Sequence, residues 1–168
     1  MKKEKLISLE IDFGKNGPSK KDVNSSYEWL PHPMSIFYHL IDSNVKLSTK
    51  YSNYINKKKT NFRIYGKIND KILLNIHSGN NFKKKKYYIK VITNKMIYSY
   101  NASNPNVMTI RQLNRIKKKI QNFKNFPVIS SIKSFSKILN NDSKKKLIVR
   151  QNRELTDKIM KFLRTNNL

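Results

Sequence analysis

Residues 6–13 alternate between apolar and polar side chains, and this period of two constrains the fold more than any other feature of the sequence. Ile7, Leu9, Ile11 and Phe13 fall on one side of an extended chain, and the polar residues fall mostly on the other. Such alternation is typical of a β-strand with one buried face. The sequence therefore predicts a half-buried strand that ends at Gly14.

A helix and a hairpin are predicted after this strand. Apolar residues at helical spacing follow Pro33, which a first helical turn tolerates, so residues 33–41 are predicted to form a short helix on the strand. Residues 62–68 and 72–77 flank the turn sequence Asn69-Asp70 and predict a β-hairpin. The Lys- and Asn-rich residues 46–60 between helix and hairpin are interpreted as a long loop or an insertion.

The second half of the chain is predicted to be mostly helical. After a turn-rich loop at residues 101–106, apolar residues recur every three or four positions in residues 109–126, 129–139 and 147–163. The expected fold class is α+β, with a small strand, helix and hairpin module in residues 1–79 and a mostly helical module with a basic C-terminal extension in residues 80–168.

The charge of the chain points to a polyanionic partner. The sequence has 36 Lys and Arg against 10 Asp and Glu, a formal net charge of +26, which a nucleic acid would neutralise. No apolar stretch predicts a membrane span, and no secretory or Arg-rich transit segment is recognised. The excess of Lys, Asn, Ile, Tyr and Phe is typical of an AT-rich genome. We therefore expect a mitochondrial location and a gene encoded in the organelle.

A family resemblance connects these features. Ile7, Leu9 and Ile11 followed by Gly14-Lys15 and Pro18 match the opening pattern Ile-x-Leu-x-Ile-x-x-Gly-Lys-x-x-Pro of bacterial-type large-subunit ribosomal protein eleven. The segment from Ile36 to Asn44, the Asp70-Lys71 hairpin and the spacing of Thr109, Gln112 and Ile116 resemble later elements of that family in the same order.

This resemblance implies a structural protein of the large ribosomal subunit that binds and stabilises the stalk-base rRNA and helps to position translation factors. The implied partners are large-subunit rRNA, neighbouring stalk proteins and, transiently, translational GTPases, with no membrane. The implied factor- and stalk-facing loop contains Gly14, Lys15 and Pro18. The chain can be aligned with the last helix of that family in two ways. In the first, the residues after Asn140 are an extension; in the second, an insertion brings Arg164 and Thr165 into the place of the family's RNA-facing segment.

Basic and polar residues of the second half are the candidate RNA ligands, since Lys and Arg neutralise phosphates and Asn or Thr hydrogen-bond riboses and bases. They are Arg111, Asn114, Arg115, Lys117, Lys118, Lys119, Lys83, Lys84, Lys85, Lys86, Lys144, Lys145, Arg164 and Thr165. Each charge run is also compatible with a merely solvated surface. The tyrosines at 87, 88, 98 and 100 either stack on bases or, more often for such residues, pack in a core.

Catalysis is not expected from the sequence. His32, His39 and His77 lack metal-ligand spacing, and there are no paired acids, no cysteine and no Gly-rich phosphate loop. We therefore predict a non-enzyme without cofactor or metal. Two alternatives stay open, a lineage-specific ribosomal or RNA-maturation protein of another family and a degenerate intron-encoded nuclease.

Overall fold

A computed structural model describes residues 4–18, 25–41, 47–56, 59–113, 118–122 and 142–166. The chain divides into two compact units, residues 1–122 and 123–168. The first unit contains an eight-stranded sheet with two short helices, α1 (Ser25–Trp29) and α2 (Pro31–Leu40). Its strands are β1 (Leu6–Asn16), β2 (Leu47–Asn56), β3 (Lys59–Ile68), β4 (Ile72–Gly79), β5 (Asn81–Thr93), β6 (Met96–Asn101), β7 (Val107–Gln112) and β8 (Lys118–Asn122).

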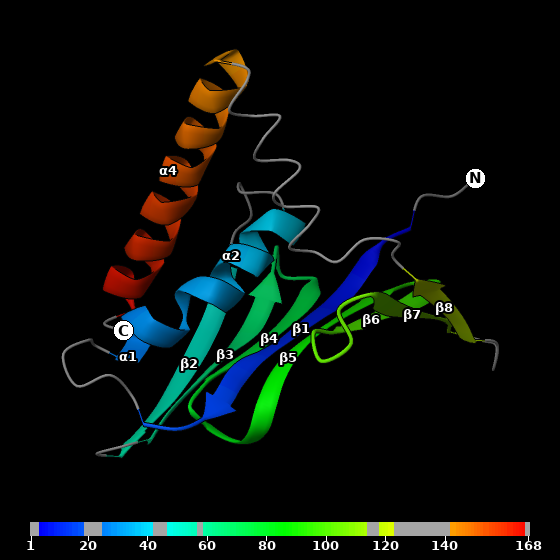
Figure 1. Cartoon of the computed structure of the whole chain (residues 1–168), viewed down its shortest axis with the longest axis horizontal. Coiled ribbons are helices and arrows are strands. Elements are labelled where there is room, and N and C mark those ends of the chain that lie inside the picture. The colour runs from blue at the N-terminus through cyan, green and yellow to red at the C-terminus, as the bar shows by residue number, and fades with distance from the viewer. Residues whose placement is uncertain are drawn as a thin grey trace. The chain divides into compact units, whose positions relative to one another are not determined.

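Strand β1 lies in the middle of the sheet, whose order is β2-β3-β4-β1-β5-β6-β7-β8 (Figure 1). It pairs in parallel with β4 and antiparallel with β5, and every other neighbouring pair of described strands is antiparallel. The chain leaves β1, forms α1 and α2, and returns through the β2-β3-β4 meander. A parallel pair needs such a long crossover connection, and here α1 and α2 lie within it.

The main core lies between α2 and the apolar face of β1, β3 and β4. Leu9 and Ile11 of β1 and Phe37 of α2 are at most 1% exposed. Ile64 and Ile76, which pair directly across β3 and β4, are fully buried in the same core. Polar residues of these strands lie on the opposite face, so the alternation of residues 6–13 correctly predicts β1. Its buried side is confirmed at Leu9 and Ile11, whereas Ile7 is 41% exposed.

Two further predicted elements are confirmed. Helix α2 begins at Pro31, two residues before the expected Pro33, and ends at Leu40. The β3-β4 hairpin turns at Asn69 and Asp70, whose φ angles of 49° and 58° are those of a type I′ turn. This turn type suits the right-handed twist of the flanking strands, and Asn and Asp tolerate its positive φ angles.

The mostly helical second half is a wrong prediction. Residues 47–56, expected as loop, form β2 against β3, and residues 109–126, expected as a helix, contain the end of β7 and all of β8. The β-branched residues Val107, Thr109 and Ile110 favour the extended chain. Met108 and Ile110 pair with Tyr100 and Tyr98 of β6, so long-range pairing overrides the helical spacing. The sheet also continues across the expected boundary at Gly79. The helix expected at residues 129–139 lies outside the described residues.

The second unit contains α4 (Asp142–Thr165), which confirms the helix expected at residues 147–163. Leu155, Ile159 and Leu163 recur every four residues along it, and Arg150 pairs with Glu154 over one turn at 2.9 Å. Across the described parts of both units, we find no helix with the length and apolar character needed to span a bilayer.

Candidate functional site

The carboxyl ends of β1 and β4 meet at one edge of the sheet, where Gly14 pairs with Gly79. The buried Ser78 hydroxyl lies 2.9 Å from the Phe13 carbonyl oxygen and 2.7 Å from the Trp29 carbonyl oxygen, as a donor to these acceptors. These contacts hold the end of α1 against the two strand ends. In sheets with parallel neighbours, ligands bind beyond the carboxyl ends of the strands. This edge is therefore a candidate ligand-binding site.

Aromatic rings from three distant segments stack at this edge. The ring of Phe13 lies 4.9 Å from the imidazole of His32 and 4.2 Å from the ring of Tyr87, centroid to centroid, with interplanar angles of 23° and 7°. The Lys85 ammonium lies 4.7 Å from the Tyr87 centroid, and Lys15 lies 5.7 Å from that of Trp29. We call Phe13, Lys15, Trp29, His32 and Tyr87 the carboxyl-edge cluster. It combines planar surfaces, a cation and an exposed imidazole.

Two neighbouring groups add polar chemistry to this cluster. The backbone between α1 and α2 is helical at Leu30, with φ −80° and ψ −29°. Glu28 and His32 are four residues apart, about one helical turn, so their side chains lie on the same side of the two helices. The indole N–H of Trp29 is buried and has no hydrogen-bond acceptor within the described residues. A buried donor normally has a partner, so this N–H is available to a ligand or a water molecule.

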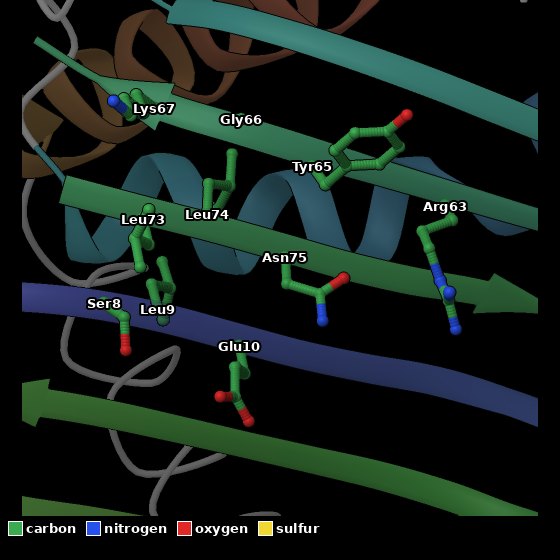
Figure 2. A pocket seen from close by; sticks show the side chains of 10 residues that line it. All are labelled: Ser8, Leu9, Glu10, Arg63, Tyr65, Gly66, Lys67, Leu73, Leu74 and Asn75. Carbon is green, nitrogen blue, oxygen red and sulfur yellow. The ribbon is translucent and has the colours of Figure 1, made fainter. Parts of the chain in front are cut away.

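A second candidate region lies on the sheet face that points away from α2, which we call the open face. A shallow depression of about 810 Å³ lies over β3, β4 and β1 (Figure 2). Arg63, Tyr65 and Lys67 contribute from β3, Leu73 and Asn75 from β4, and Ser8 and Glu10 from β1. In Figure 2 the Arg63 side chain extends from β3 across β4, whereas Glu10 points toward β5.

Ion pairs join the open face of β1 to β5. Lys90 lies 3.3 Å from Glu10, and Lys86 lies 2.5 Å from Asp12. His77 of β4 lies 3.9 Å from Asp12 and packs against the ring of Phe82 at 4.5 Å. Burial lowers the pKa of His77 below its ordinary value, and the positive charges of Arg63 and Lys86 lower it further, while Asp12 opposes the shift. His77 is therefore neutral at pH 7.

The lysine run expected to bind RNA lies on β5, where successive side chains alternate between faces. Lys85 contacts Tyr87 of the carboxyl-edge cluster, whereas Lys86 pairs with Asp12 on the open face. Lys83 and Lys84 are exposed. The run therefore forms no single basic stripe.

The other expected RNA ligands are scattered over different elements. Arg111 is exposed on β7, and Lys118 and Lys119 belong to β8. Asn114, Arg115 and Lys117 lie outside the described residues. Lys144, Lys145, Arg164 and Thr165 belong to α4 in the other unit. The helix expected to present Arg111 and Arg115 together is contradicted at Arg111, which lies in the strand β7. Individual RNA contacts of these residues stay predictions.

The expected factor-facing loop has a packing role at its first residue. A side chain at Gly14 would overlap the ring of Phe82 and the carbonyl oxygen of Gly79. Gly14 is thus required by close packing where two strands end. Lys15 contacts Trp29, and Pro18 is exposed after β1. The motif Gly14-Lys15 therefore has a structural explanation in this sheet.

Sequence reasoning did not select His32, Phe13, Arg63, Asp12 or His77. Among the tyrosines, Tyr98 and Tyr100 line an apolar groove of about 460 Å³ beside Ile36 and Leu40 of α2, and Tyr88 lies on the open face. The one sequence signal for this site was His32 itself, a histidine placed between Pro31 and Pro33. Its partners Phe13 and Tyr87 are far away in the sequence and are revealed only by strand pairing.

No model of a protein family matches the chain, and no curated protein matches it either. Solved structures do match. The chain is similar to the dehydrogenase MviM from Clostridium difficile, with a TM-score of 0.68 and 14% identity over 96% of this chain and 55% of that one. It is similar to the UDP-N-acetylglucosamine 3-dehydrogenase GnnA from Acidithiobacillus ferrooxidans, with a TM-score of 0.66 and 12% identity over 81% of this chain and 45% of that one.

A third similar structure is an inositol dehydrogenase homolog from Azotobacter vinelandii complexed with NAD⁺, with a TM-score of 0.56 and 10% identity over 70% of this chain and 36% of that one. The chain therefore spans 36% to 55% of the length of these three proteins. At such low identity the likeness establishes the fold, which is that of part of a dehydrogenase chain.

These similarities overturn the ribosomal interpretation. The structural neighbours are oxidoreductases and dehydrogenases, so the resemblance to ribosomal protein eleven is wrong, and with it the structural role in the large subunit. They give no support for rRNA, stalk proteins or translational GTPases as partners. The prediction of a non-enzyme is contradicted as well, because the matched folds belong to enzymes. The expected mitochondrial location stays a prediction.

Proposed function

We propose that this chain forms part of a dehydrogenase-type oxidoreductase and that its carboxyl-edge cluster faces the substrate. The observation that carries the proposal is the likeness of 96% of the chain to part of a dehydrogenase, at a TM-score of 0.68. The position of the cluster adds support, because it lies at the carboxyl ends of the parallel strands β1 and β4. Solved neighbours are named for action on inositol and on a sugar nucleotide, which suggests a polyol or sugar substrate.

The residues of this chain do not fit the pyrophosphate of a nicotinamide dinucleotide. A Gly-x-Gly-x-x-Gly turn and the free N–H groups of a helix start normally hold that group. The chain has four glycines, and only Gly14 and Gly17 have a spacing found in this motif, that of its second and third glycine, while Asp12 stands at the place of its first glycine. Helix α2 begins with Pro31 and contains Pro33, neither of which has an N–H, and no side chain caps it. We therefore assign substrate binding to this chain and leave dinucleotide binding to another polypeptide segment of the enzyme.

His32 is the side chain best suited to a chemical role in the cluster. Dehydrogenation of an alcohol requires a group that takes the hydroxyl proton, and imidazole is the most frequent general base. The ring of His32 is exposed to a ligand, yet its orientation is fixed by stacking on Phe13. Lys15 supplies a nearby positive charge for a substrate oxygen. We assign proton acceptance to His32 and substrate orientation to Lys15.

Calorimetric titration of the full chain tests the proposal. The probes are myo-inositol and UDP-N-acetylglucosamine, with NADH as the comparison ligand. We expect saturable binding of at least one of the two substrate probes, weakened by about tenfold or more in His32→Ala, and no saturable binding of NADH. His39→Ala is the matched control, because His39 is exposed on the same helix and its Nδ1 contacts the Ser35 carbonyl oxygen.

The control variant should bind like the wild type. Failure of both substrate probes to bind, or equal binding by His32→Ala and wild type, would remove the carboxyl-edge cluster as the substrate site.

A further inference from the structure

The open face carries positive charge that its own acids do not neutralise. Glu10 and Asp12 are each paired with a lysine of β5, Lys90 and Lys86. Arg63 and Lys67, on the β3 side of the depression, make no ion pair with any described residue. The two acids are thus already satisfied from β5, and the two β3 cations are left to act on a ligand.

We propose that the depression over β3, β4 and β1 binds a small organic anion, a carboxylate or a phosphate ester, through the Arg63 guanidinium. Its ligand is separate from the substrate of the carboxyl-edge cluster, so the inference does not depend on the proposed function. A guanidinium presents parallel N–H donors that match a carboxylate or phosphate in two-pronged geometry. The Arg63 side chain extends from β3 over β4 toward β1 and lines the depression (Figure 2).

The rest of the lining suits a polar organic molecule rather than a bare ion. The Asn75 amide offers an uncharged hydrogen-bonding group between Arg63 and Lys67, and Leu73 offers an apolar contact. The Tyr65 ring covers β3, with its hydroxyl on the side away from β4 (Figure 2). Arg63 and Lys67 are four residues apart on one strand, which separates their Cα atoms by about 13 Å. A ligand with an anionic group at one end and hydroxyls or a second acid at the other fits this spacing. The volume of about 810 Å³ lies within the range of small-molecule sites.

The position and the neutral form of His77 support Arg63 as the main contact to the ligand. It lies between Arg63 and Asp12 in one cross-strand row, since it pairs with Arg63 across β3-β4 and with Asp12 across β4-β1. Neutral His77 adds no positive charge to the row. It can, however, respond to a bound anion, because a negative charge nearby favours its protonated form.

The experiment is calorimetric titration of the full chain with citrate, glucose 6-phosphate and inorganic phosphate. We expect one-to-one binding of citrate or glucose 6-phosphate at about millimolar concentration or tighter, with inorganic phosphate weaker because it cannot reach Asn75 and Lys67. Citrate alone would identify a carboxylate ligand and glucose 6-phosphate alone a phosphate ester. Arg63→Gln should weaken binding by about tenfold, and Arg63→Lys by a smaller factor because the charge is kept while the forked geometry is lost.

Arg111→Gln is the matched control for the net charge of the chain. Arg111 is also an exposed strand arginine, but it lies on β7, five strands from β3 in the sheet order and thus roughly 24 Å away. This variant and His32→Ala should bind within about twofold of wild type. Equal weakening by Arg63→Gln and Arg111→Gln would show generic attraction to a basic chain and overturn the site. Absence of saturable binding by all three probes would overturn it too.

Discussion

The imidazole of His32 stacks on the phenyl ring of Phe13, with ring centroids 4.9 Å apart. This contact joins the first turn of α2 to the carboxyl end of β1, so the position of the proposed proton acceptor depends on the strand. It also leaves the other side of the Phe13 ring for Tyr87 of β5, at 4.2 Å. The orientation of His32 is therefore fixed by residues that belong to the sheet and lie outside its own helix.

Phe13→Leu should weaken ligand binding at the carboxyl edge while the protein stays folded. Leucine keeps an apolar contact but removes the ring on which His32 lies, so we expect about threefold to tenfold weaker binding of the substrate probe. The loss of stability should be about 1 kcal/mol, measured by urea denaturation. Tyr87→Phe is the control, since it keeps the stacked ring, and it should bind as the wild type does. Unchanged binding in Phe13→Leu would mean that the stack does not orient His32.

Gly14→Ala should destabilise the sheet by about 1–3 kcal/mol in urea denaturation, because the new methyl group would overlap the Phe82 ring. The double variant Gly14→Ala, Phe82→Leu should lose less unfolding free energy than the sum of the losses in the two single variants. Simple additivity of the two changes would contradict the packing assigned to Gly14.

Acid should destabilise the protein through His77. Its folded-state pKa lies below the ordinary 6.5, mainly because of burial, so the unfolded chain binds the proton more readily. The stabilising effect of neutral His77 is complete above about pH 6.5 and is lost as the pH falls from there through the folded-state pKa. An NMR titration of the imidazole should give a midpoint below 6.5, and addition of the open-face anion should raise it. A midpoint at or above 6.5 without ligand would contradict the assigned burial.

Asp70→Gly should stabilise the β3-β4 hairpin by about 0.5–1 kcal/mol, since Asn-Gly is the preferred pair for a type I′ turn and Asp70 has a φ of 58°. Asp70→Ala, which removes the same charge without relieving the positive φ, is the matched control and should be less stable than wild type. Thermal or urea denaturation measures both, and equal effects of the two variants would exclude the turn geometry as the cause.

Local patterns predicted only part of this fold. The alternation of β1, the prolines before α2 and the Asn69-Asp70 turn are short-range signals, and each element formed where it was expected. The strands β7 and β8 were mistaken for a helix because Ile110 and Leu113 also satisfy a helical spacing. Their state is decided by pairing with β6, which is a long-range interaction that a local pattern does not contain.

The candidate sites were even less visible in the sequence. Phe13, His32 and Tyr87 come from three segments, and Arg63, His77 and Asp12 meet only through the registers of two strand pairs. The run Lys83 to Lys86 was predicted to bind RNA because its charges are contiguous in the sequence. In the structure these residues lie on the strand β5, which places successive side chains on opposite faces. The ribosomal resemblance depended on an alternating strand followed by Gly-Lys, and Gly14 is explained here by the packing of Phe82.

A map of NMR chemical-shift changes in the ¹⁵N-labelled full chain, on titration with myo-inositol and UDP-N-acetylglucosamine, tests whether the carboxyl-edge cluster binds the substrate. We expect saturable changes at Phe13, Lys15, His32 and Tyr87, with the open-face residues Arg63 and Asn75 unchanged by the uncharged myo-inositol. Changes that are absent at the carboxyl edge with both probes, or that are spread over exposed lysines without saturation, would contradict the assignment of this chain to the substrate side of a dehydrogenase-type enzyme.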